Sequence, residues 1–156
     1  MSVAIPPFQV FLDEHREHVY RFLVASVGSQ DADDCFQETL LSALRAYPRL
    51  RVNSNLRAWV LTIAHRKALD SHRARGRRPM PVEAVATGAA DPHRERDEDL
   101  WDAVRELPSK QRAAIVLRFA NDLPHGDIGH VLGCSEEAAR RNVHEGVSKL
   151  REVLVK

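Results

Sequence analysis

The chain has 156 residues, 44% of them hydrophobic, so it is too apolar to be intrinsically disordered and long enough for one average domain or two small ones. It has 23 basic and 22 acidic residues, so its formal net charge is only +1 and does not by itself identify a partner. No basic segment precedes an apolar stretch at the start, and no apolar run approaches the ~20 residues that a membrane span needs. We therefore expect a cytoplasmic protein without membrane contact.

The first two predicted elements are amphipathic helices. The first begins near Phe8 and ends at Gly28, and the second is expected to begin at Asp31, which is placed to cap it, and to stop before Pro48. Apolar residues recur every three or four positions in both, as one buried helical face requires. The inner stripe of the second helix is expected to hold Cys35, Phe36, Leu40, Ala43, Leu44 and Tyr47.

The outer face of the second helix groups four residues at helical spacing, Asp34, Gln37, Glu38 and Leu41. The simplest interpretation is an acidic first turn, which the helix dipole favours. The alternative is a docking face for a basic protein partner.

A basic block covers the next connection and a third predicted helix, from about Leu56 to Arg75. Between Arg49 and Arg78 the sequence has nine basic residues and a single acid, Asp70. Such a block is the electrostatic footprint of a polyanion, and an aromatic ring among cations suits unstacked nucleic-acid bases. The candidate nucleic-acid residues here are Asn53, Ser54, Asn55, Trp59, Arg66, Arg73 and Arg75.

Two of these assignments have a structural alternative. Trp59 lies on the apolar stripe of its helix, where core packing is the simpler role. The arginines from Arg73 onward suit a solvated helix end with favourable dipole charges. The density of bases favours nucleic acid for the arginines.

The helical pattern stops between Gly76 and about Asp97, where prolines and a glycine interrupt it. We therefore predict an all-α chain of two helical domains with separate cores, residues 5–76 and 98–155, joined by a flexible linker, 77–97. The cysteines, Cys35 and Cys134, have no CxxC spacing and are expected to be buried free thiols rather than metal ligands.

The carboxy-terminal segment has the pattern of a helix-turn-helix. Gly133 is placed to end the first helix, and Ser135 is placed to cap the second. The second helix has a buried stripe that includes Ala139 and Val143, so its charged residues point outward near its start, where a recognition helix meets base edges and phosphates. The candidate DNA-binding residues are Glu137, Arg140, Arg141, Asn142 and His144. A plain helical hairpin with a solvated charged face is the alternative.

Four segments, in this order, resemble conserved regions of bacterial RNA polymerase sigma factors of the sigma-70 family. The segment DADDCFQETLLSALRAYPRLR resembles region 2.2, and NLRAWVLTIAHRKALDSHRARGRR resembles regions 2.3 to 2.4. The segment LWDAVRELPSKQRAAIVLRF resembles region 4.1, and LPHGDIGHVLGCSEEAARRNVHEGVSKLR resembles region 4.2. The short linker, with no third domain between, is similar to that of the extracytoplasmic-function (ECF) group.

This resemblance implies a region 2 helical bundle and a region 4 helix-turn-helix that together direct promoter recognition, −10 melting and transcription initiation. It implies that Asp34, Gln37 and Glu38 dock on the β′ clamp helices of core RNA polymerase, with the β flap and promoter DNA as further partners. It also implies that the loop 49–55 and the start of the next helix read the −10 element. The residues Arg140, Arg141, Asn142 and His144 would read the −35 element. An anti-sigma factor is a frequent partner in this group.

The recognition helix departs from the family pattern after His144, where Glu145, Gly146 and Val147 replace a basic residue, an alanine and another base. The acid removes an expected phosphate contact, and we expect weakened −35 binding. We also hypothesise that Glu145 pairs with Arg141 at the i, i+4 spacing.

Two other classes of function compete with this interpretation. A stand-alone helix-turn-helix regulator would bind duplex DNA without polymerase, but it has no use for the outer face of the second helix. An enzyme or metal protein has no support, because the histidines form no HExxH and no ligand spacing. We expect no catalytic activity, no metal and no cofactor.

Overall fold

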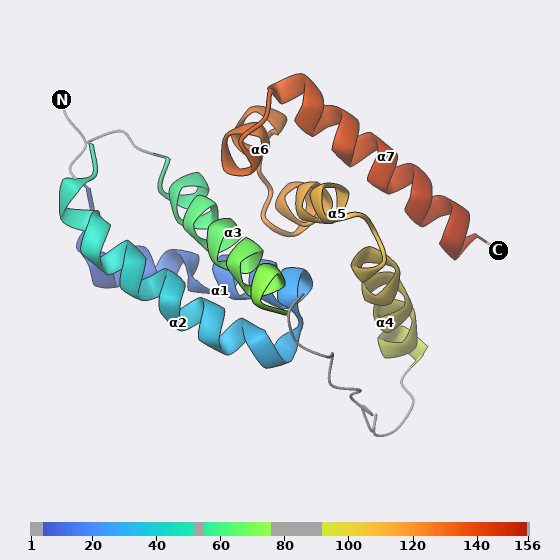
Figure 1. Ribbon diagram of the computed structural model, residues 1–156, viewed down its shortest axis with the longest axis horizontal. Coiled ribbons are helices and arrows are strands. Elements are labelled where there is room, and N and C mark those ends of the chain that lie inside the picture. Colours follow the sequence, from blue (N-terminus) through green and yellow to red (C-terminus); the bar gives the residue numbers. More distant parts are fainter. Residues whose placement is uncertain (1–4, 52–54, 76–91, 156) are drawn as a thin grey trace.

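The computed structural model describes residues 5–51, 55–75 and 92–155, and within these ranges every regular element is helical (Figure 1). The elements are α1 (Phe8–Val27), α2 (Ser29–Ala46), the short 3-10 helix η1 (Tyr47–Arg49), α3 (Leu56–Arg75), α4 (Pro92–Arg105), α5 (Ser109–Ile115), the π-helical segment η2 (Val116–Ala120), α6 (His125–Leu132) and α7 (Glu136–Leu154). The all-α prediction is confirmed for the described residues.

The amino-terminal half is a bundle of α1, α2 and α3. Gly28 is both the C-cap of α1 and the N-cap of α2, and its φ of 87° is a backbone conformation that favours glycine. The chain therefore turns within one residue, and α2 begins at once at Ser29. The prediction that Asp31 caps this helix was wrong, because Asp31 falls inside its first turn.

An aromatic cluster joins the start of α1, the end of α2 and the start of α3. The ring of Phe11 lies 5.2 Å from Tyr47 and 5.7 Å from Trp59, measured between ring centroids, and Phe8 packs against Tyr47 at 5.2 Å. The Tyr47 hydroxyl donates a hydrogen bond to the backbone carbonyl of Pro6. These contacts fix the two ends that flank the connection between α2 and α3.

The carboxy-terminal half contains the predicted turn between α6 and α7. Gly133 ends α6 with a left-handed φ of 72°, and the Ser135 hydroxyl accepts a hydrogen bond from the Ala138 backbone N–H at 3.0 Å. Both predictions for this turn are confirmed.

The segment η2, which the sequence did not predict, leads into a buried turn. The backbone N–H of Asn121 donates to the Val116 carbonyl at 3.1 Å, a π-type bond that closes the segment. Asp122 follows with a positive φ of 55°, and the Leu123 N–H donates to the Leu117 carbonyl at 3.0 Å. This turn places the fully buried Asn121 against α1.

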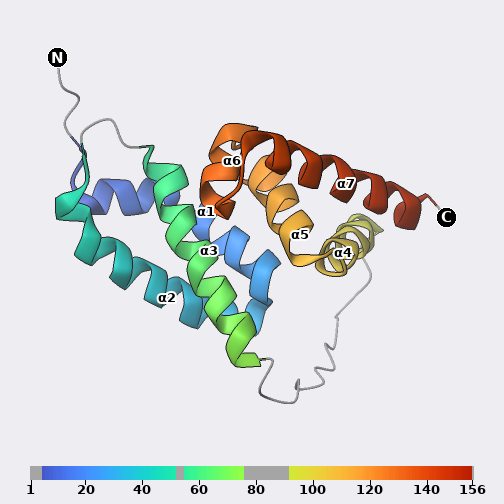
Figure 2. The same cartoon turned by 45° about the horizontal axis from the view of Figure 1, so that its top comes forward.

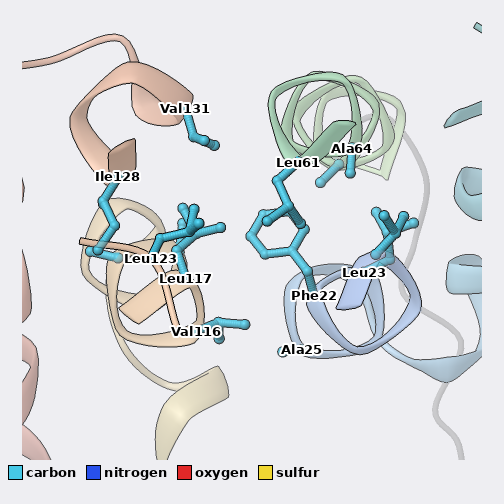
Figure 3. Packing of buried hydrophobic residues seen from close by; sticks show 14 of the residues in the cluster. Phe22, Leu23, Ala25, Leu61, Ala64, Val116, Leu117, Leu123, Ile128 and Val131 are labelled. Carbon is cyan, nitrogen blue, oxygen red and sulfur yellow. The ribbon is translucent and has the colours of Figure 1, made fainter. Parts of the chain in front are cut away.

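The two halves share one hydrophobic core, contrary to the prediction of separate cores. In Figure 3, Phe22 of α1 and Leu61 of α3 point across to Leu117 and Leu123 of the other half, and all four side chains are buried. Burying a large apolar side chain stabilises a fold by about 1.5–3 kcal/mol, so this contact is a substantial one. Figure 2 shows α3 between α2 on one side and α6 on the other.

The predicted linker, 77–97, lies mostly outside the described residues. The expectation that the helical pattern stops until about Asp97 was wrong, because α4 begins at Pro92 and includes residues 92–97. Proline suits the first turn of a helix, where its missing N–H would have no partner.

Candidate nucleic-acid interface

The outer face of α2 is exposed, as the sequence predicted. Asp34, Gln37, Glu38 and Leu41 all lie on the side of α2 opposite its buried residues, and Leu41 is 52% exposed. Leu44, which was predicted to be buried, is 51% exposed one turn further along the same face. These five residues, the α2 face, combine two carboxylates with two apolar side chains, a composition that suits docking of another protein better than solvation alone.

Asn55 lies directly before α3, and both ends of its side-chain amide are hydrogen-bonded. Its Oδ1 accepts a hydrogen bond from the backbone N–H of Ala58 at 3.2 Å, the geometry of a helix N-cap. Its Nδ2 donates to Oδ2 of Asp127 in α6 at 2.9 Å. The candidate residues Asn53 and Ser54 lie outside the described residues.

The candidate residues of α3 form a stripe along one side of the helix. Trp59 is half-buried in the aromatic cluster, which supports the packing role that was its alternative. Arg66 and Arg73 follow at helical spacing and are exposed, with the exposed Asp70 between them. The side chain of Arg75 is outside the described part of the chain. The stripe from Trp59 to Arg73 therefore combines a half-buried aromatic ring with two exposed cations.

Arg57, another member of the basic block, points to the opposite side of α3. Its Nη1 donates to the backbone carbonyl of Asn121 at 3.4 Å, and its side chain is half-buried. Sequence reasoning could not separate Arg57 from the arginines of the stripe, because the residue that binds it lies in the other half of the chain.

The start of α7 presents most of the predicted recognition residues. Glu137, Arg140, Arg141 and His144 are exposed, and Asn142 is half-buried at the margin of the packed face. One Nη of Arg140 lies 3.3 Å from Oε1 of Glu136, so this arginine pairs with an acid of the preceding turn. The packed face consists of Ala139, Val143 and Gly146, all buried, with Val147 and Leu150 half-buried beside them.

Two of the three residues that depart from the family pattern, Glu145 and Gly146, have structural roles. The exposed Glu145 accepts a hydrogen bond from Nε2 of the buried Gln111 in α5 at 3.1 Å, in place of the hypothesised pair with Arg141. Gly146 is buried, and a Cβ at this position would lie 2.7 Å from Cγ1 of Ile115 in α5. The glycine is therefore required for the close approach of α7 to α5 rather than being only a weak point of the helix.

Three histidines near the contact between the halves are shifted toward their neutral form. Burial lowers the pKa of His15, and it lowers the pKa of His18 and of His65 as well.

Within residues 5–51, 55–75 and 92–155, no group of three or more histidine, cysteine or acidic side chains is arranged to hold a metal ion. Cys35 and Cys134 are free thiols; Cys35 is buried, whereas Cys134 is only half-buried. None of the described helices is long and apolar enough to cross a membrane.

Comparison with known families and sequences gives matches over most of the chain. Residues 11–78 match the family Sigma-70 region 2, and residues 97–150 match Sigma-70, region 4. The RNA polymerase sigma factor CarQ of Myxococcus xanthus is 31% identical over 157 residues, which cover 94% of this chain and 88% of CarQ. The ECF RNA polymerase sigma factor SigE of Mycolicibacterium smegmatis is 30% identical over 166 residues, and the match spans 99% of this chain but only 64% of SigE.

Two solved structures have a similar fold. The sigma factor RpoE of Bartonella quintana, in complex with the anti-sigma factor NepR, has a TM-score of 0.78 and 24% identity, covering 94% of this chain and 96% of that one. CnrH in complex with the cytosolic domain of CnrY has a TM-score of 0.74 and 20% identity, covering 94% and 86%. At these identities the likeness shows the fold alone.

Proposed function

This chain belongs to the sigma-70 family of RNA polymerase sigma factors, in its ECF type, and we propose that it binds core RNA polymerase and directs initiation at promoters with a −10 and a −35 element. It recognises and opens the promoter, while the polymerase carries out every chemical step, so the chain itself is no enzyme. Its place of action is the cytoplasm, where the polymerase and the chromosome are. An anti-sigma factor is a further proposed partner.

The observation that carries the proposal is the exposed α2 face. The side chains of Asp34, Gln37 and Glu38 are exposed in the folded chain, and Leu41 and Leu44 project beside them. A protein that only binds DNA gains nothing from carboxylates there, because they repel phosphate. A basic, partly apolar surface of the polymerase fits this face, and the family assigns that role to the clamp helices of β′.

Recognition of the −10 element is proposed for the start of α3 and its stripe. We infer that Arg66, Arg73 and Arg75 hold the phosphates of the separated strand, while the edge of Trp59 supports an unstacked base. Asn53, Ser54 and Asn55 are proposed to contact the base that leaves the stack. The N-cap role of Asn55 supports a positioning function for it, because its side chain already fixes the first turn of α3.

Recognition of the −35 element is proposed for the first turns of α7. Arg140, Arg141 and His144 are exposed donors that reach base edges or phosphates from a helix in the major groove. We propose that the exposed Glu137 accepts a hydrogen bond from the N4 amine of a cytosine. Asn142, half-buried, is the weakest member of this set.

The test is binding to purified core RNA polymerase. Replacing Asp34, Gln37 and Glu38 by alanine should weaken binding by about tenfold or more, which corresponds to ~1.4 kcal/mol. Helicity should not change, because all three side chains are exposed. The matched control replaces one amide and two acids on α1, Gln9, Asp13 and Glu17, which are also exposed, and should bind as the wild type does.

A stand-alone regulator predicts a different result. Such a protein would shift a −35 duplex through α7 but would not bind core polymerase at any concentration used. Unchanged affinity of the α2 variant for the core enzyme would remove the docking role from this face.

A further inference from the structure

We propose that binding of the −35 element by this chain is coupled to the protonation of two histidines, His125 at the start of α6 and His144 in α7. The chain would then bind the element more tightly as the pH falls. The inference deepens the proposed function and rests on it, because it concerns the helix-turn-helix that is proposed to read this element. It also adds His125 to the residues that meet the DNA.

The permanent charges around the start of α7 cancel. We define the −35 surface as two residues that precede α7, Arg118 of η2 and His125, together with the ionisable residues in the first three turns of α7. Apart from its two histidines, this surface carries three acids and three arginines, which are Glu136, Glu137, Glu145, Arg118, Arg140 and Arg141. Carboxylates and guanidinium groups in equal number give no net attraction for a DNA phosphate. The net positive charge of this surface therefore depends on its histidines.

His125 lies close to the charged groups at the start of the recognition helix. Its imidazole is half-buried, and its charge is influenced by the guanidinium groups of Arg118 and Arg140 and by the carboxylate of Glu136. The next residue, Gly126, lies where α6 approaches α7, because a Cβ at this position would be 3.9 Å from Cδ of Glu136. The imidazole therefore borders the side of α7 that carries Arg140, one of the proposed −35 contacts.

In the free chain His125 is shifted toward its neutral form. Burial lowers the pKa of its imidazole, and Arg118 and Arg140 lower it further, against the weaker opposing effect of Glu136. The carboxylate of Asp127, two residues along α6, is hydrogen-bonded instead to the residue before α3, at 2.9 Å. A DNA phosphate beside the imidazole would have the opposite effect, because an anion within about 4–6 Å favours the charged form. Binding should therefore take up a proton.

His144 extends the titratable charge along the recognition helix. It is exposed and follows Arg140 and Arg141 by one turn, so the three side chains share one side of α7. Helix α5, on the packed side of α7, reaches this stretch with a neutral amide, which donates to Glu145 at 3.1 Å. Imidazole is the side chain whose charge changes between about pH 5 and pH 8. Protonation of both histidines would therefore give the −35 surface a net positive charge.

Protons that are taken up on binding make the affinity for DNA depend on pH. A group whose pKa is higher in the complex than in the free chain strengthens binding as the pH falls through the interval between the two values. Each proton changes the affinity by about tenfold per pH unit within that interval. The histidines whose neutral form stabilises the fold, His15, His18 and His65, lie on α1 and α3 and not on the −35 surface, so the two effects of pH can be measured separately.

The coupling is tested by binding of the full chain to a fluorescent −35 duplex, followed by anisotropy. Between about pH 8 and about pH 6.5 the affinity of the wild type should rise by about tenfold. His125→Gln and His144→Gln should each retain roughly threefold of this gain, and the double variant should show none. The matched control is His130→Gln, an exposed position of α6, which should keep the full gain. Circular dichroism of every variant at both pH values checks that the chain stays folded.

Three further measurements distinguish protonation from a merely structural role of the histidines. His125→Arg carries its charge at every pH, so it should bind more tightly than the wild type at about pH 8 and lose part of the pH dependence. The dependence of log affinity on log salt should be steeper at the lower pH, by about 0.9 for each imidazole that meets a phosphate, and equally steep at both pH values in the double glutamine variant. Calorimetry in phosphate and in Tris, whose ionisation enthalpies differ, counts the protons directly, and we expect an uptake of about one to two.

The outcomes separate this inference from the proposed function. Equal affinity at both pH values, equal binding heats in the two buffers, or a pH dependence that survives in the double glutamine variant overturns the coupling and leaves −35 binding intact. A chain that binds the duplex at neither pH overturns the coupling together with the proposed −35 role. Binding to core polymerase, measured separately, then decides alone on the docking role of the α2 face.

Discussion

At the residue scale, Gly146 leaves no room for a side chain between α7 and α5. Gly146→Ala should destabilise the chain by about 1–3 kcal/mol through overpacking, although alanine favours a helix by about 1 kcal/mol over glycine. The cause is the added Cβ, which would lie 2.7 Å from Cγ1 and 3.1 Å from Cδ1 of Ile115. The midpoint of urea unfolding, followed by circular dichroism, measures the change.

Gly126 in α6 provides the matched control. A Cβ there would have Glu136 Cδ as its nearest neighbour at 3.9 Å, an ordinary contact, so Gly126→Ala should be neutral or stabilising. In the background Ile115→Ala the penalty of Gly146→Ala should shrink, because the opposing methylene is gone. Stabilisation by Gly146→Ala alone would show that α7 can move away from α5 without loss.

Glu145 yields a prediction for DNA binding. The carboxylate borders the exposed face that carries Arg141, so it should oppose phosphate when α7 lies in the groove. Glu145→Arg should tighten binding of the full chain to a −35 duplex, and the gain should decrease as salt rises. Glu145→Gln, which keeps an acceptor for Gln111, should give part of the gain. Equal affinities of all three proteins at low salt would place Glu145 outside the interface.

Single residues were predictable where their role is local. Gly133 and Ser135 belong to a turn whose chemistry is contained in a few neighbouring residues, and both predictions are confirmed. Gly146 was misinterpreted because its reason is Ile115, in a different helix. A glycine that permits close packing cannot be distinguished in sequence from one that merely weakens a helix.

At the scale of the element, helical periodicity located the helices well. The third helix was predicted from about Leu56 to Arg75 and has those bounds, since its apolar stripe is continuous. The start of α4 at Pro92 and the π-helical η2 were missed. Helix α4 lacks apolar residues in its first turns. A π segment differs from an α-helix by one residue in its hydrogen-bond spacing, which periodicity over five residues cannot resolve.

The stripe of α3 gives a prediction at this scale. Replacing Arg66 and Arg73 by glutamine should lower promoter affinity for different sequences alike, because phosphate contacts carry no sequence information. The dependence of log affinity on log salt should become shallower by about 0.7 for each phosphate that is no longer neutralised, as for single-stranded DNA. Arg45→Gln and Arg16→Gln, exposed on α2 and α1, make a control of equal charge change. An unchanged salt slope would mean that the stripe is only a solvated helix side.

At the scale of the whole molecule, the sequence predicted two helical halves but not their shared core. Periodicity shows which face of a helix is buried and not which helix covers it, so Phe22 and Leu61 gave no sign of packing against Leu117. The burial of Asn121 was even harder to predict, since an asparagine in a turn usually faces water. The position of the halves follows from shape and polar complementarity across the contact, which one sequence does not display.

The contact between the two halves should also make the folded chain sensitive to acid. Burial lowers the pKa of His18, and the nearby Arg57 and Arg21 guanidinium groups lower it further, against the weaker opposing effect of Asp122 and Glu17. Burial also lowers the pKa of His15, which lines the same cleft as Asp127. On the other side of α3, burial and then the neighbouring His72 lower the pKa of His65.

A histidine whose pKa is lower in the folded chain binds its proton more tightly when the chain is unfolded. The stability contributed by the neutral form is therefore complete above the ordinary pKa of 6.5 and is lost as the pH falls from there through the lowered values. Lowering the pH from about 7.5 to about 5.5 should accordingly reduce the unfolding midpoint in urea. His65→Gln should flatten this dependence, because a glutamine stays neutral at every pH. His65 lines one cleft with His72 and Arg112, and Nη2 of Arg112 lies 3.3 Å from Nε2 of His72, so a second positive charge there is unfavourable. His130→Gln, an exposed position of α6, should leave the pH dependence as it is in the wild type. A chain that is equally stable, or more stable, at the lower pH would show that these histidines are not held neutral by the folded chain.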